Sequence, residues 1–138
     1  MLTVRDLMTE RPDTVAPTTA LRVVLAKLNN HGCRHLPVVD GDELVGIITD
    51  RDVRLAVNSP VLREDHDLNR EEVLDAIEAQ SCMTPEPVSV TPQTPAREAA
   101  DLLRLYKFGG LPVLDAGRLV GIVTTTDFLR HVVEREGD

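Results

Sequence analysis

The sequence predicts an α+β fold made of two related small units. Short strand-like apolar runs alternate with helical apolar stripes, and the whole pattern occurs twice. Met83, Val90 and Pro112 each lie 75 residues after an identical residue, with no gap between the copies. One copy alone has too little core to be stable. We therefore expect the copies to pack together around an approximate two-fold axis.

The repeat sets the expected boundaries. The first copy spans residues 1–58, a charged connector running into a helix spans 59–75, and the second copy spans 76–138. Within the connector, Asn69 with Glu72 three positions later is a capping-box pattern ahead of an apolar run. We expect an exposed segment over 59–68 and a helix after it.

Each copy opens with a short strand and a helix. "DTVAP" and "PVSVTP" read as strands ended by proline, which cannot donate to a ladder. Thr18 or Thr19 can cap the first helix, whereas Thr94 can cap the second with Pro95 at its first position. The helices are predicted from apolar stripes at helical spacing: Leu21, Val24, Leu25 and Leu28, and then Ala96, Ala99, Ala100 and Leu103.

A β-hairpin and a second helix complete each copy. "LPVVDGDELVGIIT" and "LPVLDAGRLVGIVT" each contain two apolar runs joined by a turn with Asp and Gly. The runs are continuously apolar, so we expect both faces of the strands to be covered. The closing helices begin after the threonine, in "DRDVRLAV" and "TTDFLRHVV".

Composition narrows the functional classes. The net charge of −8 and the 2% aromatic content, with no Trp, leave little basic surface or stacking area, which disfavours nucleic-acid binding. Apolar runs are far shorter than the roughly 20 residues that span a bilayer, and the N-terminus lacks a signal-peptide core. We expect a soluble cytoplasmic protein without membrane contact.

The spacing of the two cysteines and of the nearby histidines does not indicate a metal site. Cys33 and Cys82 lack C-x-x-C spacing and are expected to be reduced thiols. His31, Cys33 and His35 alternate in a way that could place three ligands on one face of a strand. A helix-to-strand turn is indicated there instead, and no fourth ligand is evident, so we expect no metal.

The duplicated pattern V-x-P, LPV-x-D and LVGI-x-T-x-x-D resembles a tandem pair of cystathionine β-synthase (CBS) domains, a Bateman module. The resemblance covers nearly the whole chain except the connector and leaves no catalytic domain, so it points to the stand-alone class. It implies binding of AMP, ADP, ATP or S-adenosylmethionine in clefts between the two units. It also implies a homodimer that signals to an unidentified protein partner in trans.

Thr49-x-x-Asp52 and Thr124-x-x-Asp127 carry two compatible interpretations. As helix caps, the threonine hydroxyl accepts a backbone N–H and the aspartate favours the positive helix end. As ligand groups, the free N–H groups and the hydroxyl suit a phosphate, while the carboxylate can accept from ribose hydroxyls. The resemblance favours the ligand role for these positions.

The resemblance also places the rest of a ligand site. Adenine would lie near five residues of the first copy and their five equivalents in the second: Val15, Pro17, Leu36, Pro37 and Val38, then Val90, Pro92, Leu111, Pro112 and Val113. Arg34, His35 and Arg51 are candidate phosphate contacts, with Arg34 and His35 serving a ligand held by Asp127. Core packing of the apolar residues and solvation of the charged ones are the alternatives.

We therefore expect a non-enzymatic adenosyl-ligand sensor, with a ligand-independent dimeric scaffold as the alternative. A P-loop and a recognisable nucleophile–base pair are absent from the sequence, which disfavours an enzyme. Apolar side chains on the closing helices, such as Leu55 and Leu129, favour a homodimer because so small a chain covers them poorly.

Overall fold

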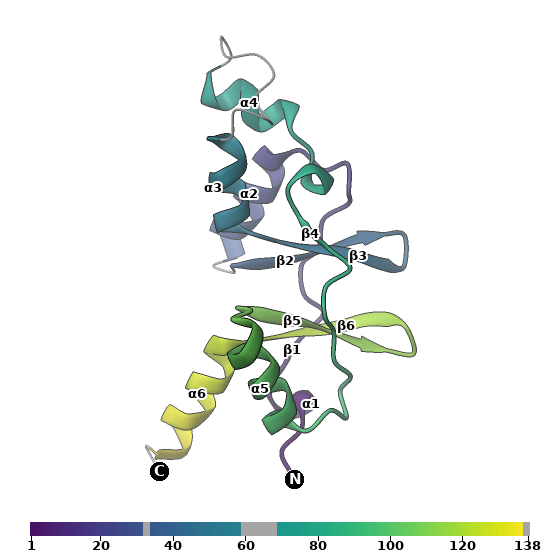
Figure 1. The fold of residues 1–138 in the computed structure, drawn as a ribbon, viewed down its shortest axis with the longest axis vertical. Coiled ribbons are helices and arrows are strands. Elements are labelled where there is room, and N and C mark those ends of the chain that lie inside the picture. Colours follow the sequence, from purple (N-terminus) through teal and green to yellow (C-terminus); the bar gives the residue numbers. More distant parts are fainter. Residues whose placement is uncertain (32–33, 59–68, 137–138) are drawn as a thin grey trace. The chain divides into compact units, whose positions relative to one another are not determined.

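The structure is a computed structural model that describes residues 1–31, 34–58 and 69–136 (Figure 1). The chain divides into two compact units. We call Asp13–Glu86 the middle unit, and Met1–Pro12 together with Pro87–Asp138 the terminal unit. The predicted α+β class is confirmed, because each unit combines helices with a three-stranded sheet.

The middle unit contains the first hairpin and the helix of the connector. Its sheet has the order β2-β3-β4 and is antiparallel throughout. Figure 1 shows α2 and α3 together at one end of the hairpin, whose loop projects the other way. The elements are α2 (Leu21–His31), β2 (His35–Asp40), β3 (Glu43–Thr49), α3 (Asp50–Val57), α4 (Arg70–Ala76), a 3₁₀ turn (Ala79–Ser81) and β4 (Thr84–Pro85).

The terminal unit repeats this arrangement with the second hairpin. Its sheet has the order β1-β6-β5, again antiparallel, with α5 and α6 at one end of the hairpin (Figure 1). The elements are α1 (Val4–Leu7), β1 (Thr9–Glu10), α5 (Ala96–Tyr106), β5 (Gly110–Asp115), β6 (Arg118–Thr124) and α6 (Thr125–Glu136).

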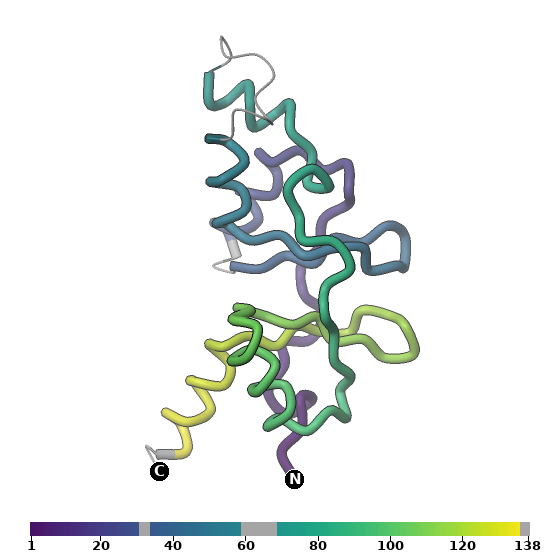
Figure 2. Tube along the Cα trace, in the orientation of Figure 1, coloured from purple at the N-terminus to yellow at the C-terminus, as the bar shows by residue number. Residues whose placement is uncertain are grey.

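The third strand of each sheet comes from the other copy of the sequence repeat. β1 precedes the first hairpin but pairs with β6 of the second, while β4 opens the second copy but pairs with β3 of the first. Figure 2 shows the purple N-terminal trace joining the green and yellow elements of the terminal unit. The compact units therefore differ from the copies 1–58 and 76–138, which describe the repeat along the sequence.

Both points where the chain passes from one unit to the other have the same strained backbone. Arg11 and Glu86, 75 residues apart, have φ values of 51° and 46°, and each precedes a proline. The left-handed region is unfavourable for side chains other than glycine. Their N–H groups donate to the carbonyls of Val120 and Val45, both at 3.2 Å, which holds each turn against the neighbouring hairpin.

The two hairpins form as predicted. Their loops have two residues each, Gly41-Asp42 and Ala116-Gly117, as the register Asp40↔Glu43 and its equivalent in the second copy require. Positive φ values at Gly41, Ala116 and Gly117 fit the turns that suit the twist of paired strands. Each first strand also carries a register shift, at Val38/Val39 and at the equivalent position.

The opening strands are shorter than predicted. "DTVAP" and "PVSVTP" contribute only single parallel bridges, Val15↔Val38 and Val90↔Val113. A turn begins directly afterwards, because the Thr19 hydroxyl accepts from the Ala16 N–H at 2.9 Å and Thr94 does the same in the second copy. Thr94 thus closes this turn instead of capping α5, whose N-cap residue is Pro95.

The predicted apolar stripes form the two cores. In the middle unit, Leu21, Val24 and Leu28 of α2 pack with buried strand residues such as Leu36 and Ile48. The terminal core contains Ala99 and Leu103 of α5 with Val90, Leu111, Val113 and Val123, and it also contains Val4 from α1. Val4 belongs to the first copy in sequence, so the exchanged segment is part of the core.

The connector helix is present and is held against α2. Asn69 caps α4 by accepting from the Glu72 N–H at 2.8 Å, as the capping pattern predicts. Arg22 of α2 makes ion pairs with Glu71 and Asp75 of α4. Residues 59–68, predicted to be exposed, lie outside the described residues. Among the described residues, no helix has the length and apolar character to cross a membrane.

Gly121 and Gly46 are predicted to be required for the exchanged strands. A Cβ at Gly121 would lie 2.9 Å from the Thr9 carbonyl oxygen, and one at Gly46 would lie 3.0 Å from that of Thr84. Because these neighbours are backbone atoms, they cannot turn aside. We expect Gly121→Ala and Gly46→Ala each to lower the free energy of unfolding by about 1–3 kcal/mol in urea titrations. Unchanged midpoints for both variants would contradict the close approach.

Candidate nucleotide-binding turns

The turn from β3 into α3 forms a complete capping box. The Thr49 N–H donates to Asp52 Oδ2 at 2.9 Å, and the Asp52 N–H donates to Thr49 Oγ1 at 3.2 Å. Thr49 has extended backbone angles, as an N-cap residue should. In the structure this motif therefore caps α3. Asp52 Oδ1 and the Thr49 hydroxyl proton have no partner among the described residues.

The equivalent turn from β6 into α6 has more internal hydrogen bonds. Asp127 Oδ2 accepts from the Thr124 N–H at 2.8 Å and from the Thr124 hydroxyl at 3.1 Å. Its other oxygen, Oδ1, accepts from Arg130 Nη1 at 3.3 Å. Asp127 is 6% exposed, and it is the one charged residue that is buried among the described residues. In this copy the aspartate and the threonine are both engaged internally.

A third Thr-x-x-Asp box occurs at Thr3 and Asp6, where sequence analysis did not identify one. The Thr3 N–H donates to Asp6 Oδ2 at 2.8 Å at the start of α1. The letters "TVRD" carry the signal, but no hairpin precedes them. The motif alone is therefore a helix cap. Only the two copies that follow β3 and β6 are candidates for ligand binding.

The residue opposite each threonine differs between the copies. His35 pairs with Thr49 in the β2–β3 register, whereas Gly110 pairs with Thr124. Cross-strand partners point to the same face of a sheet, so an imidazole stands beside one threonine and no side chain beside the other. Burial lowers the pKa of His35, and Arg34 adds to this, while Asp50 and Asp52 oppose it. The neutral imidazole is favoured at neutral pH.

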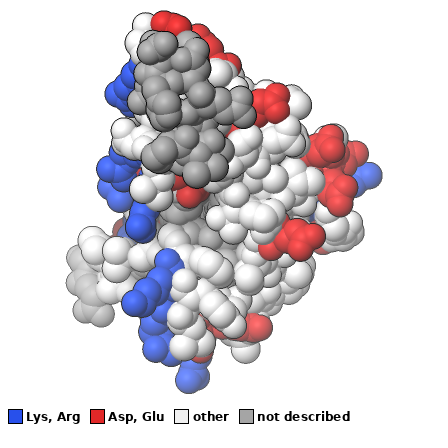
Figure 3. Space-filling view, turned by 45° about the horizontal axis from the view of Figure 1, so that its top comes forward, with Lys and Arg blue, Asp and Glu red and all other residues white. Residues whose placement is uncertain are grey.

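The other basic candidates lie at the surface near this turn. Arg34 and Arg51 are exposed, and neither has an ion-pair partner among the described residues. They flank His35 and the start of α3, where their guanidinium groups are available to an anion. Figure 3 shows that basic and acidic side chains both occur on the face it displays.

The predicted adenine residues come together in pairs but are mostly core. Val15 lies beside Val38, with the Val15 N–H donating to the Pro37 carbonyl at 3.1 Å and the Val39 N–H donating back at 2.9 Å. The second copy has the same bonds. The side chains of this set are buried except for Pro17, which is half-buried: Val15, Leu36, Pro37, Val38, Val90, Pro92, Leu111, Pro112 and Val113.

Cys82 is a neighbour of Asp52 that sequence analysis did not identify. Burial, together with the Asp52 charge, raises the pKa of its thiol to about 11, so the thiol is protonated at neutral pH. It is half-buried in the middle unit. Cys33 lies outside the described residues. Among the described residues, no group of three or more His, Cys, Asp or Glu side chains is placed to hold a metal ion.

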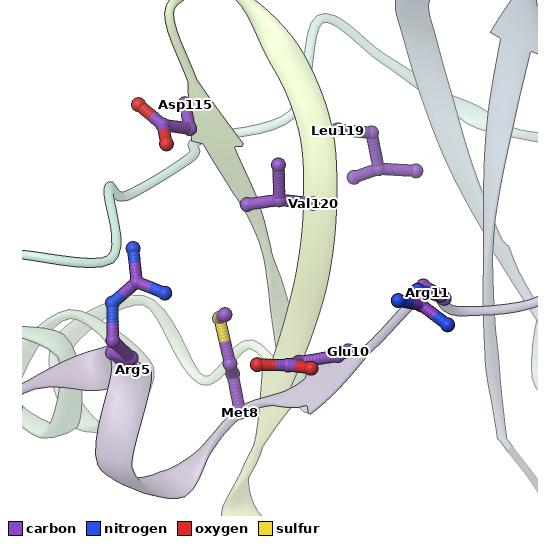
Figure 4. A pocket seen from close by; sticks show the side chains of 7 residues that line it. All are labelled: Arg5, Met8, Glu10, Arg11, Asp115, Leu119 and Val120. Carbon is purple, nitrogen blue, oxygen red and sulfur yellow. The ribbon is translucent and has the colours of Figure 1, made fainter.

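A cavity of about 280 Å³ lies elsewhere on the terminal unit. Figure 4 shows its lining from α1, β1, the residues next to them and the β5–β6 hairpin: Arg5, Met8, Glu10, Arg11, Asp115, Leu119 and Val120. None of these residues belongs to the predicted ligand set. The cavity is therefore distinct from the hairpin-to-helix turns.

The chain belongs to the CBS domain family, whose profile matches residues 4–59 and 71–134. A CBS domain-containing protein of Dictyostelium discoideum is 46% identical over 133 residues, covering 95% of this chain and 91% of that protein. The structure of CBSX2 of Arabidopsis thaliana in complex with AMP is similar with a TM-score of 0.80 and 33% identity, covering 99% of both chains.

A second similar structure contains other adenosine-containing ligands. The CBS domain pair of the protein MJ0100, in complex with 5′-methylthioadenosine and S-adenosyl-L-methionine, is similar with a TM-score of 0.78 and 28% identity. The match covers 98% of each chain. The predicted membership of a tandem CBS pair is thus confirmed by the family profile and by structure.

The lowered pKa of His35 predicts a pH-dependent stability. An unfolded imidazole titrates near pH 6.5, so below this pH the unfolded chain binds more protons than the folded one. His35 therefore makes stability fall as the pH falls through 6.5. We expect His35→Asn to lose less of its free energy of unfolding than wild type between pH 7.5 and 5.5 in urea titrations. Equal losses, or a His35 NMR titration above pH 6.5, would contradict the assignment.

Proposed function

We propose that the protein is a non-enzymatic regulatory module that binds an adenosine-containing ligand at its hairpin-to-helix turns. One observation carries the proposal: the Thr49–Asp52 turn combines an available hydroxyl proton, an available carboxylate oxygen and the start of an eight-residue helix. These groups match the hydroxyls of ribose and the charge of a phosphate.

The proposed contacts follow from this chemistry. Asp52 accepts from the ribose hydroxyls through Oδ1, and the Thr49 hydroxyl donates to a ligand oxygen. The N-terminus of α3 favours an anion, and the exposed guanidinium of Arg51 lies in its first turn. Adenine would contact the edges of the paired Val15 and Val38 segments, whose side chains otherwise fill the core. Thr124, Asp127 and the Val90 and Val113 segments form the second proposed set.

The ligand class is supported by the similar proteins of known structure. AMP is bound in CBSX2, and 5′-methylthioadenosine and S-adenosyl-L-methionine are bound in MJ0100. These compounds share an adenosine part. We propose AMP, ADP, ATP or S-adenosylmethionine as a regulatory ligand, with no resident cofactor required.

The proposal includes a mode of action. A ligand changes a protein's signalling only through different affinities for two states of that protein, and a partner reads the shift. We propose that the protein is cytoplasmic and acts on an unidentified protein partner in trans. We also propose that residues 1–58 and 76–138 are the two CBS domains in sequence. The Dictyostelium relative matches over 91% of its length, which supports a module that acts without an attached catalytic domain.

A ligand-independent scaffold is the second candidate, and the Thr3–Asp6 box favours it. That box shares with both candidate turns the hydrogen bond from the threonine N–H to the aspartate Oδ2, but it has no hairpin before it. If all three boxes act only as helix caps, the protein would serve as an interaction surface.

We also propose a homodimer. Leu129, Val132 and Val133 of α6 are 61%, 56% and 70% exposed and lie at helical spacing on one face. Leu55 of α3 is 59% exposed. A second copy of the chain is the occupant that we propose for these apolar faces.

Ligand binding should raise thermal stability. At 100 times its dissociation constant a ligand stabilises the native state by about 2.7 kcal/mol. We expect a raised melting temperature with at least one of AMP, ADP, ATP and S-adenosylmethionine, and none with GTP as the control nucleotide. The shift should be lost in the double variant Asp52→Asn/Asp127→Asn, checked for folding by circular dichroism. No shift with any adenosyl compound, after bound nucleotide has been removed, would favour the scaffold.

Charges on α6 should dissociate the dimer. We expect wild type to sediment as a dimer and Leu129→Asp/Val133→Asp to sediment as a monomer, because two carboxylates would be buried without partners. Val88→Asp, which changes an exposed valine outside the helices, is the control and should remain dimeric. A wild-type monomer at micromolar concentration would reject the homodimer.

A further inference from the structure

We propose that Arg130 makes the two turns unequal by acting as an internal competitor for ligand at Asp127. The Thr49–Asp52 turn then binds ligand first and more tightly, whereas the Thr124–Asp127 turn binds only after Arg130 has released its carboxylate. This inference rests on the proposed function and describes the regulation of the same two turns.

The hydrogen-bond inventory of the two turns supports the difference. Asp127 accepts three hydrogen bonds, from the Thr124 N–H, the Thr124 hydroxyl and Arg130. Asp52 accepts from the Thr49 N–H. In the terminal unit the threonine proton and the second carboxylate oxygen are therefore both used. In the middle unit both remain available to a ligand, as far as the described residues show.

Burial increases the cost of releasing Arg130. The side chain of Asp127 is 5% exposed, while that of Arg130 is 58% exposed. A buried carboxylate that loses a charged donor must regain equivalent hydrogen bonds. Ribose hydroxyls are neutral donors, so they replace the guanidinium only in part. The exposed Arg130 side chain can turn into solvent, so the exchange is feasible at higher ligand concentration.

The sequence repeat supplies a matched comparison. The residue 75 positions before Arg130 is Leu55, which occupies the same place three residues after Asp52 and is 59% exposed. Leucine cannot donate to the carboxylate. Arg54, also on α3, forms an ion pair with Asp50 instead of Asp52, with 3.9 Å between Nη2 and Oδ2. Besides differing at Arg51/Thr126 and at His35/Gly110, the two turns thus differ at this exposed helix position, which belongs to neither core.

The unequal turns would extend the range of ligand concentration over which the protein responds. The first turn would fill at low ligand concentration and the second only when the concentration rises further. Two successive binding steps give two populations of the protein, with one and with two ligands, and each is available to a partner. Arg130 sets the separation between the two steps.

The test is isothermal titration calorimetry with AMP, and with S-adenosylmethionine as a second probe, on the full chain. We expect two steps in wild type. Arg130→Leu should raise the affinity of the weaker step by about tenfold or more, because a charge-assisted hydrogen bond no longer competes. The reciprocal Leu55→Arg should weaken the tighter step by a similar factor. Arg130→Lys, which keeps a cation, should stay close to wild type, and Arg135→Leu is the control for lost charge on α6.

The outcomes separate this inference from the proposed function. Two equal steps in wild type, or a weaker step that Arg130→Leu leaves unchanged, would overturn the role of Arg130 while nucleotide binding stands. An equal gain with Arg135→Leu would assign the effect to net charge and would also overturn it. Absence of binding of both probes to wild type and to Arg130→Leu would overturn the proposed function together with the inference.

Discussion

The pairing of β1 with β6 and of β4 with β3 is the interaction on which the rest of the structure depends. Neither copy of the repeat contains all three strands of a sheet, so each unit is completed by a segment from the other copy. Gly46 and Gly121 make this possible, because each leaves room for a backbone carbonyl and a methionine of the incoming segment. The exchange also brings Val4 and Ala79 into cores that their own copies do not form.

The completed sheets place the two Thr-x-x-Asp boxes at the ends of β3 and β6. In each, the hydrogen bonds that start a helix also hold a hydroxyl and a carboxylate close together. Under the function that we propose, ligand binding would compete with helix capping for the same polar atoms. The Thr49–Asp52 box leaves one carboxylate oxygen and one hydroxyl proton available, whereas Arg130 occupies the second carboxylate oxygen of the Thr124–Asp127 box. One exposed position, Leu55 or Arg130, marks this difference.

The residues around the two Thr-x-x-Asp boxes also differ between the copies. His35 stands opposite Thr49 and is kept neutral by burial, whereas Gly110 stands opposite Thr124. Cys82 lies near Asp52 and remains a thiol because burial and the carboxylate both oppose its ionisation. The repeat thus preserves the backbone of the turn and varies the side chains around it. Under the proposed function, such variation would give two related sites with different ligand responses.

The sequence by itself determined the features that depend on neighbours within one copy. The hairpins, the stripe of α2, the cap at Asn69 and the Thr-x-x-Asp motifs follow from local spacing and turn chemistry. Only the tertiary structure decided the strand exchange, since β1 and β4 have two residues each and carry no strand pattern. It also decided the burial of Asp127 and the neighbourhood of Cys82 and Asp52, because burial and long-range contacts arise only when distant segments pack.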